Sequence, residues 1–221
     1  MTNERNLIPL MIDLSGRNVV IIGGGSVGER KAALFSRYAD TTVVSVRFTT
    51  KLEKMKDAGK LNLVQADLSS LPDDKITELI SNAFLVIPAT NNIQLNDRIV
   101  DIARKSDILI NKVDSVGDVV VPSVITRGKL TIGISTLGSS PALSKYARKK
   151  IEQIITPQYA DMIRLQDEMR TYLKQHVPDQ EDRKDILWKI LENEDVWNAL
   201  SESYEKAYNI AHDIILKQMT D

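Results

Sequence analysis

The chain has 221 residues, and its 29 lysine and arginine residues nearly balance its 30 aspartate and glutamate residues. This balance gives no reason to expect attraction of the whole chain to nucleic acid or to an anionic membrane surface. The sequence contains no cysteine, which excludes disulfides, thiolate metal ligands and a cysteine nucleophile. No apolar run approaches the roughly 20 residues of a membrane-spanning helix. We therefore expect a soluble, cytoplasmic globular protein with neither nucleic acid nor membrane as a partner.

Short β-branched runs alternate with helix-like segments through the first half of the chain. The predicted strands are Asn18–Ile22, Thr41–Val46, Leu61–Gln65, Phe84–Ile87 and Ile108–Ile110. The predicted helices between them are Val27–Arg37, Thr50–Ala58, Asp74–Ser81 and Ile93–Lys105. This alternation is typical of βαβ units, which predicts an α/β, Rossmann-like parallel sheet over residues 1–116. A ligand of such a sheet binds at the carboxyl ends of the strands.

The first predicted strand runs directly into the glycine motif Gly23-x-Gly25-x-x-Gly28. In a dinucleotide-binding turn the first glycine permits the tight turn, the second lets the backbone approach a pyrophosphate, and the third lets the helix pack closely. The helix that begins near Ser26 would offer its free N–H groups to the phosphates. The strand–turn–helix context favours a dinucleotide site; the alternative is an ordinary glycine-rich turn without a ligand.

The adenosine end of this predicted site is less regular. An acidic residue is expected about 20 residues beyond the glycines, where it binds the ribose hydroxyls of NAD. The second predicted strand instead leads into Arg47 and Phe48, with no acid. Arg47 could meet a 2′-phosphate, stack on adenine or face solvent, so the choice between NAD and NADP stays open at this stage.

Polar residues follow two further strands at the same edge of the predicted sheet. Thr90 and Asn91 could bind the nicotinamide ribose or carboxamide, although Asn91 could instead cap the helix that begins near Ile93. Asp114 follows the fifth predicted strand, and a carboxylate there could accept a proton beside the cofactor. The alternative is that Asp114 only caps a turn.

The pattern changes after residue 117. Two β-rich runs, Val119–Ile125 and Leu130–Ser135, flank a turn-like Thr-Arg-Gly-Lys sequence. They could form a hairpin, extend the sheet or add strands to a partner subunit. Ser140 and Pro141 then predict the start of a helix, as N-cap and first helical residue.

The chain beyond Ala142 is helical in pattern. Pro157 and the His176-Val-Pro178 break divide it into about three predicted helices. An apolar stripe at helical spacing predicts a face that packs as core or against a partner helix. Its members are Val196, Leu200, Tyr204, Ala207, Ala211 and Ile214.

Charge is distributed unevenly in the second half. Residues 119–151 contain no acidic side chain but carry six basic ones: Arg127, Lys129, Lys145, Arg148, Lys149 and Lys150. This face could simply be solvated, or it could attract an acidic substrate. The two histidines lie in the helical tail, so we predict no metal site.

Three motifs in combination carry a family resemblance. They are Gly-Gly-Gly-x-Val-x-x-Arg-Lys at residues 23–31, Asn-Lys-Val-Asp at 111–114 and Ile-Ser-Thr-x-Gly-x-Ser-Pro at 134–141. With them, residues 7–155 resemble the precorrin-2 dehydrogenase family, the dehydrogenase/ferrochelatase module of siroheme synthases. The resemblance implies that NAD takes a hydride from precorrin-2, a tetrapyrrole polycarboxylate, to give sirohydrochlorin.

The resemblance also implies roles for individual residues. Asp114 falls on the family's proposed proton acceptor. The family's phosphate and adenosine contacts fall on Ser26 and Val27 and on Arg47 and Phe48. With the residues predicted above from their own pattern, the cofactor contacts are Gly23, Gly25, Ser26, Val27, Gly28, Arg47, Phe48, Thr90 and Asn91. The predicted substrate contacts are Ser135, Thr136, Ser139, Arg127 and Lys145. It further implies a homodimer, with residues 117–150 as the dimerisation and substrate region and an all-helical domain at 151–221.

Some positions depart from the family pattern. Gly28 replaces the usual alanine, and Asn91 and Asn92 stand where an aspartate pair is common. Lys112 replaces an apolar residue, and its cation would favour an ionised Asp114 if the two are close. The loop that follows Asp114 is about two residues short. Two alternatives stay open: an enzyme that also inserts Fe²⁺ into sirohydrochlorin, and a non-catalytic dinucleotide sensor.

Overall fold

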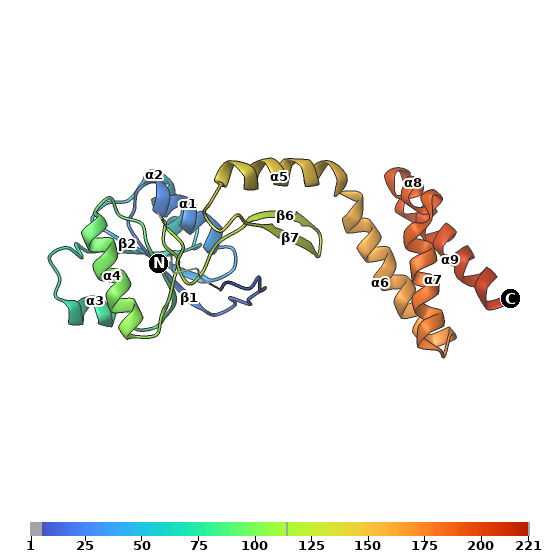
Figure 1. Ribbon diagram of the computed structural model, residues 1–221, viewed down its shortest axis with the longest axis horizontal. Coiled ribbons are helices and arrows are strands. Elements are labelled where there is room, and N and C mark those ends of the chain that lie inside the picture. Colours follow the sequence, from blue (N-terminus) through green and yellow to red (C-terminus); the bar gives the residue numbers. More distant parts are fainter. Residues whose placement is uncertain (1–5, 114, 221) are drawn as a thin grey trace. The chain divides into compact units, whose positions relative to one another are not determined.

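A computed structural model describes residues 6–113 and 115–220 (Figure 1). The chain divides into two compact units, Met1–Val121 and Pro122–Asp221. The boundaries predicted at residues 116 and 150 stay predictions. Asp114, the predicted proton acceptor, lies outside the described residues. No helix within the described ranges is long and apolar enough to cross a membrane.

The first unit is a parallel sheet with helices between its strands, as predicted. Its strands are β1 Asn18–Ile22, β2 Asp40–Ser45, β3 Asn62–Gln65, β4 Ala83–Pro88 and β5 Leu109–Ile110. Its helices are α1 Ser26–Phe35, α2 Thr50–Asp57, α3 Asp73–Ile80 and α4 Ile93–Lys105. The predicted and observed bounds differ by at most two residues at each end, and the bounds of β1 and α4 agree fully.

The order of strands in the sheet is β3-β2-β1-β4-β5, and every neighbouring pair is parallel. The chain moves outward from β1 to β3 and then crosses to the other side of β1 to form β4. The strand order therefore reverses between β1 and β4, which is where open α/β sheets bind ligands.

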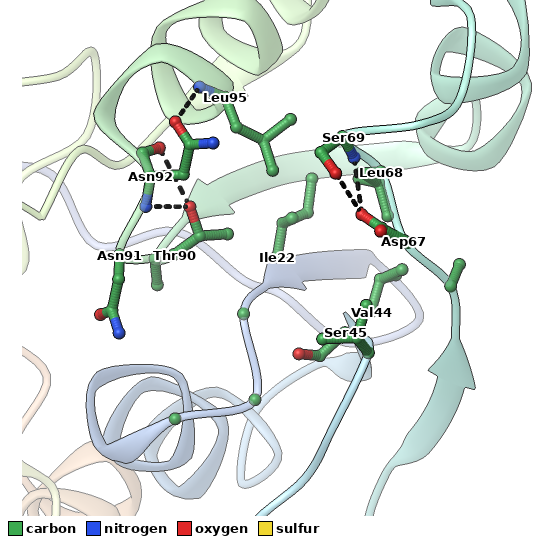
Figure 2. A pocket seen from close by; sticks show the side chains of 16 residues that line it. Ile22, Val44, Ser45, Asp67, Leu68, Ser69, Thr90, Asn91, Asn92 and Leu95 are labelled. Atoms are coloured by element: carbon green, nitrogen blue, oxygen red, sulfur yellow. Dashed lines mark hydrogen bonds between the residues drawn. The ribbon is translucent and has the colours of Figure 1, made fainter.

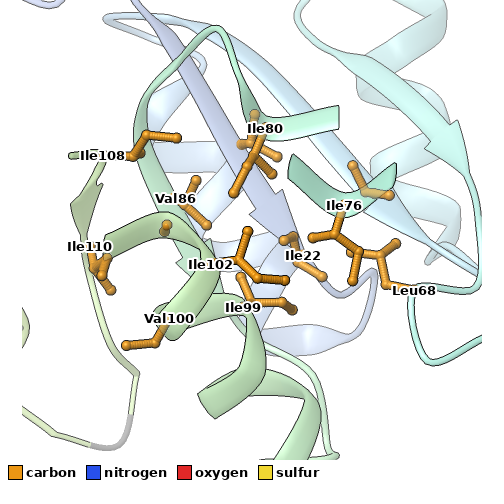
Figure 3. Close-up of a cluster of buried hydrophobic side chains, with 13 residues drawn as sticks. Ile22, Leu68, Ile76, Ile80, Val86, Ile99, Val100, Ile102, Ile108 and Ile110 are labelled. Carbon is orange, nitrogen blue, oxygen red and sulfur yellow. The ribbon is translucent and has the colours of Figure 1, made fainter. Parts of the chain in front are cut away.

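The central strands β1 and β4 are buried on both faces, and their side chains alternate between two hydrophobic clusters. In β1, Val19 and Ile21 pack with residues of α1 and α2, whereas Val20 and Ile22 pack with residues of α3 and α4. The second cluster is shown in Figure 3, where Ile76 and Ile80 of α3 meet Ile99 and Ile102 of α4. Strands covered on both faces are near-continuously apolar, which explains the β-branched runs of the sequence.

The second unit begins with a two-stranded antiparallel hairpin of β6 Ser123–Arg127 and β7 Leu130–Ile134. Of the three arrangements considered for these runs, the hairpin is confirmed. The expected strand from Val119 was wrong in its first half. Val119 instead donates its N–H to the carbonyl oxygen of Ile110 at 3.0 Å, and Val119 and Val121 pack against the first unit's core.

Helices form the rest of the second unit. They are α5 Pro141–Ile154, α6 Gln158–His176, α7 Gln180–Glu192, α8 Glu194–Glu202 and α9 Tyr204–Thr220. Ser140 caps α5, as predicted, by accepting the N–H of Leu143 at 3.2 Å. The predicted breaks at Pro157 and Pro178 are confirmed, but the single helix expected after Pro178 was wrong.

Two polar residues divide that last segment into α7, α8 and α9. The Asn193 side chain accepts the N–H of Val196 at 3.0 Å and so starts α8, and α9 begins directly after Ser203. Both are N-cap residue types, so this was the signal available in the sequence. The predicted stripe is core nonetheless, since Val196, Ala207 and Ala211 are fully buried in one cluster.

Candidate functional site

The glycine loop between β1 and α1 leaves no room for side chains at two of its motif positions. Gly23 has φ +122°, and a Cβ there would lie 2.4 Å from the carbonyl oxygen of Ala89. A Cβ on Gly28 would lie 1.8 Å from the carbonyl oxygen of Gly23. The Gly23 N–H donates to the carbonyl oxygen of Val44 at 2.8 Å, which ties the loop to β2. The first and third motif glycines are therefore required by the fold itself.

Gly25 is different, because a Cβ built on it meets no atom within 4 Å. This residue is the N-cap of α1, and among the described residues no side chain caps the helix there. The N–H groups of the first turn, which begins with Ser26 and Val27, are therefore open to a ligand. A phosphate fits this position by chemistry and by space, because the helix N-terminus favours an anion and the glycine allows close approach.

One acidic side chain, Glu29, stands in the first turn of α1. Its carboxylate accepts the Thr49 hydroxyl at 2.8 Å and pairs with Lys51 at 3.2 Å. These two hydrogen bonds hold the pKa of Glu29 below its ordinary value. The charge near the phosphate position is thus balanced by Lys51.

A pocket with a cavity volume of 310 Å³ opens at the switch point of the sheet (Figure 2). It is lined by Ile22, Gly23, Gly24, Gly25, Val44, Ser45, Val46, Ala66, Asp67, Leu68, Ser69, Ala89, Thr90, Asn91, Asn92 and Leu95. Four of the predicted cofactor residues meet here: Gly23, Gly25, Thr90 and Asn91. We call this the nucleotide pocket.

The other predicted cofactor residues lie beside the nucleotide pocket and do not line it. Ser26, Val27 and Gly28 belong to the first turn of α1. Arg47 is exposed, and Phe48 is half-buried and packs against the core of the unit. A Cβ on Gly24 would lie 2.1 Å from the Arg47 carbonyl oxygen and 3.0 Å from the Phe48 ring. Backbone and ring therefore set the shape of the loop here.

A hydrogen-bonded turn follows β4 on the opposite wall. The Thr90 hydroxyl lies 2.7 Å from the Asn96 Oδ1 and 3.1 Å from the backbone N–H of Asn92. The N-cap of α4 is Asn92, whose side chain accepts the N–H of Leu95 at 3.1 Å. The alternative of Asn91 as the cap was therefore wrong. Asn91 is exposed, and in Figure 2 its side chain extends away from this turn.

The third wall was missed in the sequence analysis. Asp67, Leu68 and Ser69, in the loop between β3 and α3, also line the nucleotide pocket. The Asp67 carboxylate accepts the Ser69 N–H at 3.0 Å and the Ser69 hydroxyl at 2.5 Å. The signal was present, because these residues directly follow the third predicted strand and share the ligand-binding edge.

The segment after β5 is tied at its two ends. The buried Asn111 donates its side-chain N–H to the Val119 carbonyl oxygen at 2.7 Å, and the Asp118 N–H donates to the carbonyl oxygen of Ile110 at 2.9 Å. A Cβ on Gly117 would lie 2.4 Å from the same Ile110 oxygen. The described ends of the 111–119 segment are thus fixed at the carboxyl end of β5.

A lysine of α1 supports this segment from the other side. Lys31 donates from Nζ to the Oδ1 of Asn111 at 2.7 Å. Burial removes water from the ammonium group, and together with the nearby charge of Arg30 it lowers the pKa of Lys31. Lys31, the last residue of the first family motif, therefore contributes a structural contact to the residue that directly follows β5.

Lys112 was expected to act on Asp114 if the two were close. The structure gives Lys112 another partner, because its Nζ lies 3.3 Å from the Asp97 carboxylate of α4. The expected influence on Asp114 stays a prediction.

In the second unit, the predicted substrate residues fall into two groups. Thr136 organises the first: its Oγ1 lies 3.1 Å from the Ser144 hydroxyl and accepts the Ser140 N–H at 3.0 Å. Its carbonyl oxygen accepts the Ser139 N–H at 2.9 Å. Ser135 and Ser139 are exposed in the same loop. Ser135, Thr136 and Ser139 are therefore together at the start of α5.

Arg127 lies apart from this group, at the turn end of the hairpin, where it pairs with Leu130. Its guanidinium donates to the Ile155 carbonyl oxygen at 3.0 Å, beside the end of α5. Lys145 is exposed in the second turn of α5, nearer to the Thr136 loop. Lys145 is therefore the better placed of the two predicted basic contacts.

Comparison with known proteins adds three similarities. Residues 10–123 match the family model described as "Putative NAD(P)-binding". A protein of Methanosarcina barkeri named precorrin-2 dehydrogenase is 62% identical over 215 residues, covering 97% of this chain and 96% of that protein. The siroheme synthase of Blochmanniella pennsylvanica is 31% identical over 204 residues, covering 91% of this chain and 41% of that protein.

One solved structure shares the fold across both units. The structure of "SirC, precorrin-2 dehydrogenase" superposes with a TM-score of 0.73, covering 94% of this chain and 98% of that one at 23% identity. The predicted combination of a Rossmann-like sheet, a small β region and a helical tail is confirmed.

Proposed function

The chain belongs to the precorrin-2 dehydrogenase family, and from this premise we propose that it oxidises precorrin-2 to sirohydrochlorin with NAD as the hydride acceptor. The observation that carries the proposal is the 62% identity over 97% of the chain to a precorrin-2 dehydrogenase. In the reaction the substrate loses two electrons and two protons. One hydride passes to the cofactor, and one proton passes to a base.

NAD would bind in the nucleotide pocket, and the bound cofactor would supply the carbon that accepts the hydride. Gly25 and the first-turn N–H groups of α1 would hold the pyrophosphate, since this position is open and carries the positive end of the helix dipole. Thr90 and Asn91, beyond β4, are proposed for the nicotinamide half. This arrangement would set the dinucleotide across the carboxyl ends of β1, β2 and β4.

We assign the base to Asp114. The support is its place in the Asn-Lys-Val-Asp motif, whose first residue directly follows β5 in the sequence. A positioned carboxylate serves as a general base.

The experiment is an anaerobic assay of the purified protein with precorrin-2 and NAD, followed by the absorbance of sirohydrochlorin. We expect product only when NAD is present. Asp114→Asn should keep NAD binding and lose about 100-fold or more in rate. Asp101→Asn removes the same charge from an exposed position on α4 and should change neither.

The outcomes separate the enzyme from the sensor. No turnover by a protein that binds NAD would contradict the dehydrogenase and leave a dinucleotide sensor. Full turnover by Asp114→Asn would contradict only the assignment of the base. Adding Fe²⁺ after the oxidation is complete tests the ferrochelatase activity that the resemblance leaves open.

The substrate would meet the second unit at the loop around Thr136. Ser135, Thr136 and Ser139 offer hydroxyl groups, and Lys145 offers a cation to the carboxylates of a polycarboxylate substrate. Arg127 stays a predicted contact, although its guanidinium is engaged by the Ile155 carbonyl oxygen.

We also propose that the protein is a homodimer whose interface includes α5. None of the residues of this helix is buried, yet Leu143, Tyr146 and Ile154 are 55%, 60% and 70% exposed. Their spacing of three and eight residues places them on one face, and such an apolar face is typical of a subunit interface. Leu143→Glu should produce monomers in sedimentation, whereas Trp188→Glu, at an exposed tryptophan of α7, should not.

A further inference from the structure

The choice between NAD and NADP turns on charge near the ribose of the adenosine half. A Rossmann-like site for NAD usually places an acid at the end of its second strand. Here β2 ends at Ser45, and the next charged residue is the basic Arg47. That pattern by itself would suit the 2′-phosphate of NADP. The nucleotide pocket nevertheless contains one acid among its described lining residues, Asp67.

Asp67 lies just beyond β3, the strand next to β2. Gln65, the last residue of β3, pairs in register with Ser45, the last residue of β2. The Ala66 N–H then donates to the Ser45 carbonyl oxygen at 3.1 Å, so the two chains stay together past the strand ends. Asp67 follows directly, beside the end of β2 where an acid is expected (Figure 2).

The loop that carries Asp67 is held firmly. Leu68 is only 3% exposed and is part of the core between the sheet and α3 and α4. Arg98 of α4 donates to the Leu71 carbonyl oxygen at 2.7 Å and to the Leu68 carbonyl oxygen at 3.4 Å. The same guanidinium pairs with Asp73 at the start of α3. A loop fixed in this way presents its carboxylate without ordering cost on binding.

The carboxylate itself keeps one oxygen for a ligand. Both hydrogen bonds from Ser69 go to Oδ1, and within the described part of the chain Oδ2 has no hydrogen-bond partner. These bonds favour the charged form and lower the pKa of Asp67, so the group is anionic at neutral pH. It offers acceptors only, which suits a hydroxyl and repels a phosphate.

We propose that Asp67 is the residue that makes the nucleotide pocket select NAD over NADP. Its carboxylate accepts a hydrogen bond from a hydroxyl of the adenosine ribose and repels the 2′-phosphate that NADP carries there. The acid expected at the end of β2 is thus supplied by the β3–α3 loop. The inference rests on the proposed function, which places a dinucleotide in this pocket.

The test is the pair of dissociation constants for NAD and NADP, measured by calorimetry without substrate. The wild-type protein should bind NAD more tightly. Asp67→Asn should narrow the ratio of the two constants about tenfold, mainly by tighter NADP binding, as expected for one charge pair near a protein surface. Asp57→Asn, which removes an equal charge at the end of α2, should leave the ratio unchanged.

A ratio unaltered by Asp67→Asn would overturn the inference while NAD binding still supported the proposed function. The inference would also be overturned if NAD binding weakened and the ratio stayed constant. The carboxylate would then accept a hydrogen bond from the adenine amino group, which both dinucleotides carry. Failure of the wild-type protein to bind either dinucleotide would instead remove the proposed function.

A second measurement needs no variant. Salt screens the repulsion between a carboxylate and a phosphate. The preference of the wild-type protein for NAD should therefore decrease as salt is raised from about 0.05 to about 0.5 M, a range that spans physiological ionic strength. A preference that rises with salt would show that the cation of Arg47 controls selection, and would overturn the assignment to Asp67.

Discussion

The glycine loop and the β3–α3 loop form two walls of the same pocket, yet they are shaped by different forces. In the glycine loop, Gly23 and Gly28 are packed so tightly against backbone that a methyl group would clash. In the β3–α3 loop, Asp67 is placed by hydrogen bonds from Ser69 and by the anchor of Arg98. The first wall is determined by the absence of side chains and the second by their presence.

This difference predicts how each wall responds to substitution. A steric clash with backbone atoms is relieved only if the backbone itself moves. A side chain added in the glycine loop should therefore alter the fold and the binding of NAD together. Side-chain hydrogen bonds at a partly exposed loop are individually weak, so a change there should alter affinity or selectivity while the unit stays folded.

The largest effect is expected from Gly23→Ala. The added Cβ would lie 2.4 Å from the Ala89 carbonyl oxygen at a φ of +122°, and NAD binding should be lost. The free energy of unfolding should fall by about 3 kcal/mol. Thermal denaturation and calorimetry measure both quantities. Gly59→Ala is the matched control, because Gly59 has φ +67° but no atom within 4 Å, and it should cost only about 1 kcal/mol and keep NAD affinity.

Gly25→Ala should separate binding from folding within the same loop. No atom lies within 4 Å of the added Cβ, so the melting temperature should not change. The methyl group would occupy the space proposed for the pyrophosphate, and loss of one charge-assisted hydrogen bond should raise the dissociation constant for NAD about tenfold. Unchanged NAD affinity would contradict the proposed position of the phosphates.

A smaller effect is expected from Arg98→Ala, which removes the anchor of the β3–α3 loop. It removes the hydrogen bonds to the carbonyl oxygens of Leu68 and Leu71, so the Asp67 loop should loosen. The dissociation constant for NAD should rise about threefold to fivefold, consistent with one or two neutral hydrogen bonds. Arg104→Ala removes an exposed arginine from the same helix and should have no effect on the affinity.

The smallest effect on the nucleotide pocket is expected from Asn193→Ala in the second unit. This change removes the cap of α8 and should destabilise that helix by about 1 kcal/mol. Hydrogen exchange of the α8 amides should report the loss, while the dissociation constant for NAD stays at its wild-type value. A change in NAD affinity would show that the tail is coupled to the pocket.

Local patterns in the sequence determined most of the first unit and the outline of the second. The alternation of strand-like and helix-like segments predicted all five strands of the sheet. Its reason is clearest in β1 and β4, because strands buried on both faces must be apolar. The glycine spacing predicted the turn after β1, because the strand, the motif and the helix are adjacent in the sequence. The contact that excludes a side chain at Gly23 is with Ala89 of a distant segment, and only the structure shows it. The helix breaks after Ser203 and at Asn193 were also visible as cap residues, although they were missed.

Tertiary structure decided which side chains share the nucleotide pocket. Asp67 and Thr90 are 23 positions apart in the sequence, and only the parallel register of β1, β2, β3 and β4 brings both to one edge. It also decided that Asn92 and not Asn91 caps α4, and that Lys112 pairs with Asp97. Periodicity reports which face of an element is buried, but contacts between distant elements depend on how the chain packs, and that information is not local.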